Sequence, residues 1–408
     1  MYEQMSRISL RLSHTIVLIF YKLTFILIIL CASFIACSQT TNNSNKLTQD
    51  FESSKLDIVN PINPELVDIT GWINSSPFTI EDMKGKVVLV DFFTYTCVNC
   101  IRTYPYLIHW HNKYKDYGLV VLGVHAYEFE FEKDIENVRK AIKRHGLEYP
   151  IAMDNKRGTW DAFDNFAWPA KYLIDKNGHT QYSHYGEGAY LETEEKIREL
   201  LISAGFDLSG VNIEEINIPS YQDELFEPIS NNSELELTRE LYTGVDRNYG
   251  SIQYMGIPPY IVQSEYFQGS NKDVLYEDRD FHVNNFVYLH GLWNNHQEYI
   301  KHARHTERLD DYIAIKFSAT SVNAVMGQLG ERDYKVYITM DGLPLNSTNA
   351  GFDIEFDEKN NSYVLVNESK MYQLINLQSL ESHELKLSSN SVEFSLFAFT
   401  FGSERFSP

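Results

Sequence analysis

Two cysteines with two residues between them are the part of this sequence best suited to chemistry. Cys97 and Cys100 follow the apolar run VVLVDFF at 87–93, and Cys100 begins the helical pattern at 100–114. This spacing lets the two sulfur atoms come within bonding distance in one helical turn, so they can form a reversible disulfide. The N–H groups and dipole at a helix N-terminus stabilise a thiolate on the first cysteine. We therefore expect Cys97 to be an exposed nucleophile and Cys100 to resolve a mixed disulfide.

A carboxylate is expected to serve this pair as a proton acceptor. Asp91 lies six residues before Cys97 on the apolar run, where a charged group is costly unless it is paired or has a function. Burial raises the pKa of a carboxyl group, which would let Asp91 accept the proton of Cys100. The alternative is a hydrogen-bonded buried acid that takes no part in the chemistry.

The residues expected to meet a substrate lie beside the cysteines and on a later loop. Trp168-Pro169 precedes the strand pattern KYLID at 171–175. A cis peptide bond before Pro169 would present the preceding backbone to an extended substrate. We expect Trp168, Val98 and Asn99 to bind substrate, with packing against the cysteines as the alternative for Trp168.

Strand and helix patterns alternate around these residues and predict an α/β domain. The expected strands are 87–93, 119–125, 151–153, 171–175 and 180–185, and the expected helices are 100–114, 134–145, 159–163 and 192–205. Two of the buried strands should be parallel. Beyond about residue 210 the pattern changes to short alternating runs, which predict an all-β sandwich of jelly-roll type. The clearest of these runs are 311–319, 335–345, 362–369, 371–377 and 392–402.

The N-terminal residues are expected to form a targeting segment. Residues 23–36 are almost unbroken hydrocarbon, shorter than the roughly 20 residues of a membrane span but suited to a secretory signal. Phe34-Ile35-Ala36-Cys37, followed by a polar stretch, resembles a bacterial lipobox and predicts lipidation of Cys37. An uncleaved anchor and simple secretion are the alternatives, and all three place the rest of the chain outside the cytoplasm.

Length and charge limit the classes of function. The chain has 408 residues and a net charge of −21, which argues against binding nucleic acids or anionic lipid head groups, so no nucleic-acid partner is expected. Four cysteines are too few for a disulfide-held scaffold, and the length indicates more than one domain. The expected division is a signal peptide with lipobox at 1–37, a tether at 38–64, the α/β domain at 65–206, a linker at 207–235 and the β-sandwich at 236–408.

Together these motifs resemble a known family. A strand carrying Asp91, then the Cys97–Cys100 pair, then Pro105, with a distant proline before another strand, is similar to the thioredoxin fold. The tract WINSSPFTIEDMKGKVVLVDFFTYTCVNCIRTYPYL resembles the TlpA-like, or redoxin, branch of that fold. The tracts VLGVHAYEFEFEKD and HYGEGAYLETEEKIRELL are similar to the soluble part of DipZ-type proteins, in which a β-sandwich resembling a carbohydrate-binding module follows. The resemblance implies a thioredoxin-like first domain with Cys97 and Cys100 as the redox pair and Pro169 as a cis-proline.

The predicted function is an extracytoplasmic, membrane-tethered thiol–disulfide oxidoreductase, with a reductase favoured over an oxidase or isomerase. Its substrates would be protein thiols and disulfides, its electron donor a membrane or periplasmic protein, and no organic cofactor is implied. The competing hypothesis is a lipoprotein that binds glycan or a protein partner through the β-sandwich. In that case the CxxC would be a structural disulfide.

Metal binding is the other possible use of a CxxC motif. His109 and His111 lie two residues apart and point to different sides of a helix, so they cannot both complete a zinc site, and no metal is expected. His125 is the third ligand in an alternative copper site, although a polar strand end is favoured for it.

Two further groups of side chains are expected to be structural. Glu128 and Glu187 could flank the active site, but we favour exposed loop carboxylates for both. Four aromatic residues of the second domain could stack on a sugar, but packing in the core or between domains is favoured for Trp293, Tyr254, Tyr260 and Tyr299.

Overall fold

The computed structural model describes residues 64–212, 235–248, 258–279 and 281–403. The predicted signal peptide and lipobox with Cys37, the tether before residue 64 and Tyr254 lie outside the described residues. Within the described ranges, no helix combines the length and apolar character needed to cross a membrane.

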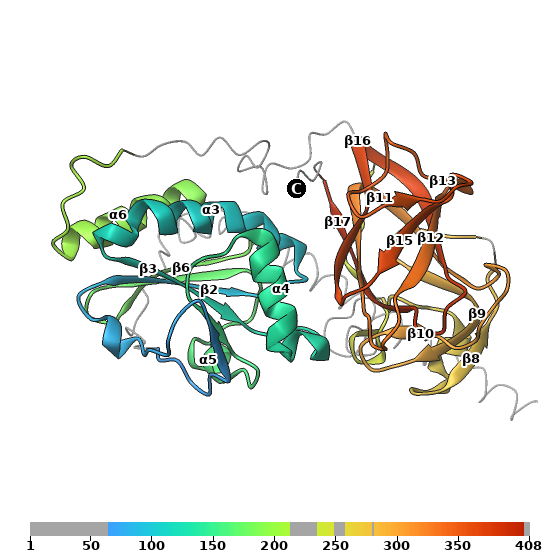
Figure 1. The fold of residues 1–408 in the computed structure, drawn as a ribbon, viewed down its shortest axis with the longest axis horizontal. Coiled ribbons are helices and arrows are strands. Elements are labelled where there is room, and N and C mark those ends of the chain that lie inside the picture. The colour runs from blue at the N-terminus through green and yellow to red at the C-terminus, as the bar shows by residue number, and fades with distance from the viewer. Residues whose placement is uncertain (1–63, 213–234, 249–257, 280, 404–408) are drawn as a thin grey trace, which may run out of the picture. The chain divides into compact units, whose positions relative to one another are not determined.

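The described residues up to 212 form an α/β domain (Figure 1). Its strands are β1 (Gly71–Ile73), β2 (Val87–Phe93), β3 (Leu119–His125), β4 (Ile151–Met153), β5 (Ala170–Ile174) and β6 (Thr180–Tyr185). Its α-helices are α3 (Val98–Tyr114), α4 (Ile135–His145), α5 (Gly158–Ala162) and α6 (Tyr190–Ser203). Short 3₁₀ helices are η1 (Glu81–Met83), η2 (Lys115–Tyr117) and η3 (Glu130–Lys133).

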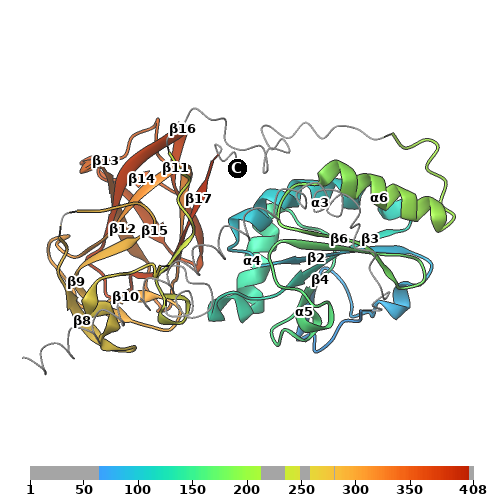
Figure 2. The same ribbon diagram turned by 180° about the vertical axis from the view of Figure 1, so that it is seen from behind.

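The six strands form one mixed sheet in the order β1-β4-β3-β2-β5-β6. β2 pairs in parallel with β3, and β3 with β4, whereas β5 runs antiparallel to β2. One face packs against α3, α4 and α6, and the other packs against α5. Both views show α3 and α6 side by side over the sheet (Figures 1 and 2). Because both faces are covered, every residue of β2 is buried, which explains its continuous apolar run.

Local sequence explains where the helices lie. Asp134 caps α4 by accepting a hydrogen bond from the N–H of Glu136, and Gly146 ends the helix with φ +66°. In α3, Leu107, Trp110 and Tyr114 recur at helical spacing and are all 0% exposed. This buried side fixes α3 on the sheet, and with it the orientation of the CxxC segment.

The predicted elements of this domain are confirmed with small differences. The strands predicted at 87–93, 119–125, 151–153 and 180–185 have the expected bounds. Pro105 lies inside α3, and the helix continues past it to Tyr114. β1 was not predicted, because Gly71–Ile73 (GWI) does not form a continuous apolar run like that of the equally short β4 (IAM).

The second domain is all β, as predicted. Its strands are β7 (Leu241–Tyr242), β8 (Asp273–Tyr276), β9 (Val287–Asn295), β10 (Ile300–His302), β11 (Tyr312–Met326), β12 (Tyr334–Met340), β13 (Leu343–Pro344), β14 (Glu355–Phe356), β15 (Ser362–Val366), β16 (Lys370–Ser388) and β17 (Ser395–Gly402). A 3₁₀ helix, η5 (Ser264–Gln268), precedes β8. The five predicted runs fall in β11, β12 with β13, β15, β16 and β17, but β11 and β16 are longer than expected, and β8 to β10 were not predicted.

The long strand β11 joins different parts of the second domain. Residues 312–315 pair with β9, residues 321–326 pair with β17, and β16 runs along both portions. The register with β16 shifts between Ala319 and Ser321. Such irregularities let a strand bend from one layer to another, and here the network encloses a single apolar core.

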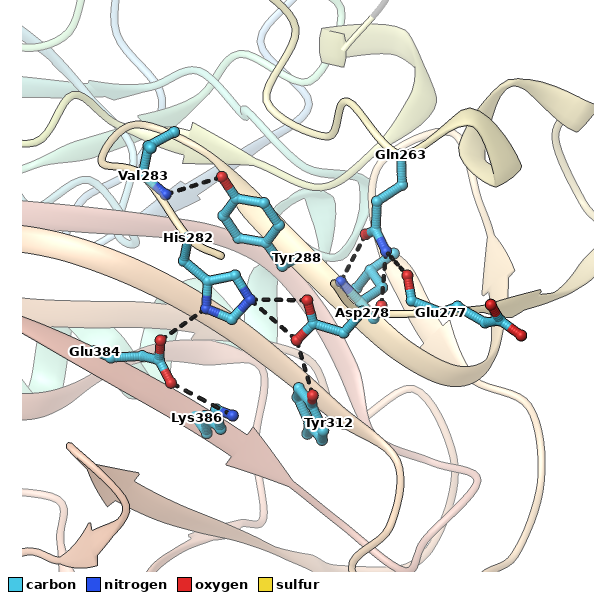
Figure 3. Close-up of polar contacts among 10 residues, drawn as sticks. Gln263, Glu277, Asp278, His282, Val283, Tyr288, Tyr312, Glu384 and Lys386 are labelled. Atoms are coloured by element: carbon cyan, nitrogen blue, oxygen red, sulfur yellow. Dashed lines mark hydrogen bonds and ion pairs between the residues drawn. The ribbon is translucent and has the colours of Figure 1, made fainter. Parts of the chain in front are cut away.

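A polar network fastens the segment between β8 and β9 to the rest of this domain (Figure 3). His282 lies between two carboxylates, with Nδ1 2.8 Å from Glu384 and Nε2 2.8 Å from Asp278. The hydroxyl of Tyr312 donates to Asp278 at 2.8 Å, and the ring of Tyr288 stacks on His282.

Among the described residues there is no group of three His, Cys, Asp or Glu side chains that could hold a metal ion.

The three aromatic residues considered for sugar stacking that the structure describes, Trp293, Tyr260 and Tyr299, are not gathered on an exposed platform. Trp293 is 0% exposed, and its indole N–H donates to the carbonyl oxygen of His290 at 2.8 Å. Tyr260 and Tyr299 are half-buried. The prediction of core packing is therefore confirmed for Trp293.

Candidate active site

Cys97 and Cys100 lie at the start of α3, and both are free thiols in the structure. Cys97 is the N-cap residue, and the N–H of Cys100 donates to its Sγ at 3.2 Å. The helix therefore begins at Val98 and not at Cys100 as predicted. The reason is that the sulfur of Cys97 takes the capping role that a side-chain oxygen usually has. An N–H group that the first turn cannot use internally is thereby directed at the Cys97 sulfur.

The two thiols differ in their access to solvent. Cys97 is half-buried, whereas Cys100 is 0% exposed and belongs to the core cluster beneath α3. Burial raises the pKa of Cys100, and the neighbouring Cys97 raises it further. A reagent from solvent therefore meets Cys97 first, and Cys100 keeps its proton until a base removes it.

Asp91 lies within electrostatic reach of Cys100. Alternation along β2 places Asp91 on the same face as Leu89 and Phe93, which belong to the cluster that contains Cys100. Its side chain is 0% exposed, and neither carboxyl oxygen has a hydrogen-bond donor among the described residues. Burial raises the pKa of Asp91 to about 7, while the charge of Lys171 opposes this rise. The charge of Asp91 in turn raises the pKa of Cys100.

Lys171, which the sequence did not single out, shares the interior with Asp91. The two residues are directly opposite in the antiparallel β2–β5 pair, and Lys171 Nζ is 4.0 Å from Asp91 Oδ1. Both side chains are 0% exposed. Burial lowers the pKa of Lys171, and the charge of Asp91 acts in the opposite direction. The available signal was a lysine near the start of the apolar strand AKYLI, but such a residue can equally face solvent at a strand end.

The peptide bond between Trp168 and Pro169 is cis, as the resemblance implied. The next residue, Ala170, pairs with Phe92 of β2, so Pro169 lies at the end of the sheet where β2 leads to Cys97. Trp168 is half-buried, with its ring 4.6 Å from that of Trp160. Trp168 thus packs against Trp160 and stays partly exposed, and the structure records no ring contact between Trp168 and either cysteine.

The two spacer residues differ in exposure. Val98 is 2% exposed, because it lies on the covered side of the first turn of α3, so its side chain does not fit the substrate-binding role expected for it. Asn99 is half-buried, and its side-chain oxygen accepts a hydrogen bond from Arg102 Nη1 at 3.3 Å. Of the two, only Asn99 keeps a partly accessible side chain.

The prediction that Glu128 and Glu187 are exposed loop carboxylates was wrong. The Glu187 side chain is 8% exposed and lies 3.2 Å from Arg102 Nη1. The Glu128 side chain is 12% exposed and lies 2.7 Å from Arg247 Nη2. The tertiary fold supplies each acid with an arginine from a distant part of the chain, which no local pattern reveals.

His125 ends β3 as predicted, and the strand end is buried. Its side chain is 0% exposed, and burial lowers its pKa to about 3, so the ring is neutral near pH 7. The ring stacks on Tyr95 and meets the edge of Phe93. His125 therefore acts as a packing residue beneath the loop that leads to Cys97.

Two families match the chain. Residues 67–183 match the AhpC/TSA family, and residues 254–402 match a family described as thioredoxin like C-terminal domain. These matches, with the DipZ similarity below, confirm the redoxin resemblance of the sequence.

Each of these relatives matches less than half of the chain. Protein DipZ of Mycobacterium bovis is 41% identical over 192 residues, which are 46% of this chain and 26% of DipZ, so the chain matches about a quarter of that protein. The thiol-disulfide oxidoreductase YkuV of Bacillus subtilis is 29% identical over 34% of this chain and 93% of YkuV. A solved structure of a thioredoxin-like protein in the oxidized form is 28% identical and covers 35% of this chain and 95% of its own, with a TM-score of 0.32.

Proposed function

We propose that this protein is a thiol–disulfide oxidoreductase with Cys97 and Cys100 as its redox pair, because residues 67–183 match the AhpC/TSA family and contain this pair at the start of α3. The observation that carries the proposal is the asymmetry of the two thiols. One is half-buried and accepts a hydrogen bond from the helix, and the other is sealed in the core beside a carboxyl group with a raised pKa.

The proposed reaction proceeds in two exchange steps. The Cys97 thiolate attacks a substrate disulfide, which forms a mixed disulfide and releases one substrate thiolate. Cys100 then gives its proton to Asp91 and attacks the Cys97 sulfur, which releases the second substrate thiolate and leaves a Cys97–Cys100 disulfide. Two electrons pass from the protein to the substrate, and a donor of dithiol or equivalent chemistry must return the pair to its reduced form.

Substrate contacts are proposed to lie around Pro169. The backbone before Pro169 would pair with an extended segment of a protein substrate, and the partly exposed Trp168 and Asn99 would contact the side chains of that segment. This assignment is supported by the position of Pro169 at the end of β5 nearest the CxxC segment.

We favour the reducing direction. A strong oxidant owes its potential to a thiolate that is stabilised in the reduced form, and Cys100, whose pKa burial raises, contributes no such thiolate. The reduction potential of the pair, measured against glutathione or dithiothreitol buffers, tests this choice. A value near or below about −250 mV would support a reductase, and a value of about −120 to −180 mV would indicate an oxidant or isomerase.

The proposed location is the extracytoplasmic side of a membrane, with Cys37 lipidated. The support is the hydrocarbon run and lipobox-like residues at 23–37. Mass spectrometry of the membrane fraction should find a lipid-modified Cys37. The electron donor of the Cys97–Cys100 pair would be a membrane or periplasmic protein. Recovery of an unmodified, membrane-free chain would overturn this location.

Trapping of substrates tests the reaction itself. In the full chain, Cys100→Ser should accumulate mixed disulfides with other proteins, because the resolving thiol is gone while Cys97 still attacks. These adducts should run as dithiothreitol-sensitive bands on non-reducing gels. Cys97→Ser is the matched control and should show neither these adducts nor turnover of a disulfide substrate such as insulin. If Cys100→Ser traps no more protein than Cys97→Ser, the proposed reaction is wrong.

A further inference from the structure

Glu132 is a buried carboxylate that no ion pair compensates within the described residues. It lies in η3, the short helix between β3 and α4, and its side chain is 0% exposed. A buried charge is costly unless several donors satisfy it. Glu132 Oε2 accepts hydrogen bonds from the N–H groups of Glu128 and Phe129, the latter at 2.9 Å. These two bonds close the 128–132 loop upon itself.

The other oxygen of Glu132 reaches the segment that carries the nucleophile. Thr96, the residue directly before Cys97, donates from its hydroxyl to Glu132 Oε1 at 2.5 Å. Thr96 is 1% exposed, so water cannot replace this acceptor. The N–H of Cys97 bonds to the carbonyl of Thr94 at 3.3 Å, which makes residues 94–97 a tight turn. The Thr96–Glu132 bond thus joins this turn to the η3 loop.

The η3 loop is itself firmly held, so it can serve as a fixed support. Asn137 donates to the carbonyl of Phe131 at 3.0 Å, and Asn155 donates to the carbonyl of Lys133 at 2.9 Å. Phe129 is 2% exposed in an apolar cluster. A support anchored at several points transmits its position through Thr96 to the Cys97 backbone.

From these contacts we infer that Glu132 is a positioning residue for Cys97, acting through Thr96, in the redox reaction proposed above. Its role is to hold the turn so that the Cys97 sulfur stays at the N-cap position of α3, where the Cys100 N–H donates to it. The side chain of Glu132 does not touch the reacting sulfurs. Burial also raises the pKa of Glu132 to about 7, so its charge is sensitive to conditions near neutrality.

The test compares variants that remove or keep the hydrogen bond between Thr96 and Glu132. Thr96→Val removes the donor but keeps the shape of the side chain and both bonds within the η3 loop, whereas Thr96→Ser keeps the hydroxyl. Thr193→Val is the control, because Thr193 is also 0% exposed in this domain and its hydroxyl also meets one side chain, that of Tyr182. The readout is the rate at which iodoacetamide labels Cys97 in the reduced full chain, followed on its peptide by mass spectrometry across pH 5–9.

Thr96→Val should lower the Cys97 labelling rate at pH 7 by about two- to tenfold, the range set by the net contribution of one hydrogen bond. Thr96→Ser and Thr193→Val should keep the wild-type rate. Glu132→Gln keeps the size of the side chain but removes its negative charge, and it should also lower the Cys97 labelling rate. This variant replaces Thr96→Val in the test if Thr96→Val does not fold. A wild-type labelling rate in both Thr96→Val and Glu132→Gln would overturn the inference. An equal fall in the labelling rate of Thr193→Val would also overturn it, as would a labelling rate in Thr96→Ser as low as that in Thr96→Val. Iodoacetamide labelling needs no substrate, so the two proposals can fail separately. If Cys100→Ser traps no partner but Thr96→Val slows the labelling of Cys97, the proposed function is wrong and the positioning role of Glu132 stands.

Discussion

Lys171 Nζ lies 4.0 Å from Asp91 Oδ1, and neither side chain is exposed to solvent. The strand register alone makes them neighbours, since they face each other across β2 and β5. Two buried groups of opposite charge depend on each other, because removing one leaves the other uncompensated. The readiness of Asp91 to take a proton from Cys100 is therefore set jointly by burial and by Lys171.

Asp91→Asn should slow the release of mixed disulfides by about 10²- to 10⁴-fold, the usual contribution of a general base. In the wild type the release rate should rise as the pH increases through about 7, because only the ionised carboxyl group can accept the Cys100 proton. The variant should lose this dependence. Acid-quenched time courses of a mixed disulfide with a model peptide measure the rate, with Asp175→Asn in the β5–β6 hairpin as the control. A wild-type pH profile in Asp91→Asn would exclude Asp91 as the proton acceptor.

Lys171→Met should move the same profile to higher pH. The lysine charge lowers the pKa of Asp91, so its removal raises that pKa and delays ionisation. Lys86→Met, an exposed lysine just before β2, is the matched control and should leave the midpoint unchanged. A midpoint that stays in place or falls in Lys171→Met would contradict an electrostatic role for this lysine.

The contribution of Asp91 to the free energy of unfolding should fall as the pH rises from about 4 to 7. In this window the unfolded chain ionises Asp91, whose pKa is then near 3.8, while the folded protein keeps it protonated up to about 7. The folded state thus binds more protons, and raising the pH favours unfolding. Asp91→Asn should flatten this slope by up to about 1.4 kcal/mol per pH unit, the value for one proton. Urea denaturation at several pH values measures the slope, and an unchanged slope would mean that Asp91 ionises normally in the folded protein.

Alkylation should separate the two thiols of the reduced protein. Cys97 is half-buried and Cys100 is 0% exposed with a raised pKa, so brief treatment with iodoacetamide should label Cys97 at least about tenfold faster. Peptide mass spectrometry gives the two rates, and both thiols should react alike in urea. Preferential labelling of Cys100 in the native protein would reverse the assigned roles.

Gly291→Ala should destabilise the second domain far more than Gly342→Ala does. Both glycines have positive φ, +94° and +78°, so alanine is strained at either position by about 1–2 kcal/mol. A Cβ at Gly291 would lie 2.1 Å from Asp311 Cγ, whereas a Cβ at Gly342 meets nothing within 4 Å. Asp311 cannot easily move, because it bonds to Arg304 and His302. We expect overpacking to add about 1–3 kcal/mol at Gly291. Thermal unfolding of the two variants checks this, and equal losses would show that strain alone acts.

The sequence was informative where a local pattern carries the structure. The apolar run 87–93, the cysteine spacing and the lone carboxylate of Asp91 predicted β2, the start of a helix and a buried acid, all of which the fold contains. These features depend on neighbouring residues, so periodicity and composition are enough to find them.

The missed residues depend on contacts between distant segments. Lys171 gains its place from the β2–β5 register, and Glu132 was one acid among several in EFEFE until the fold buried it against Thr96. β9 was missed because Gly291 on its buried side and Leu292 on its other side interrupt the alternation of apolar and polar residues in VYLHGLWNN. Charged side chains that tertiary structure removes from water leave no periodic signal.

The register of β2 and β5 also constrains the order in which the protein can assemble. β2 is a central strand, and its partner β5 is about 80 residues further along the chain. A chain that grows from its N-terminus therefore has both thiols and Asp91 before Lys171 has been made. Until β5 inserts, this half-built sheet carries a cysteine pair with no counter-charge for its acid and with an open hydrogen-bonding edge on β2. The two thiols would then be open to oxidation before the sheet is complete.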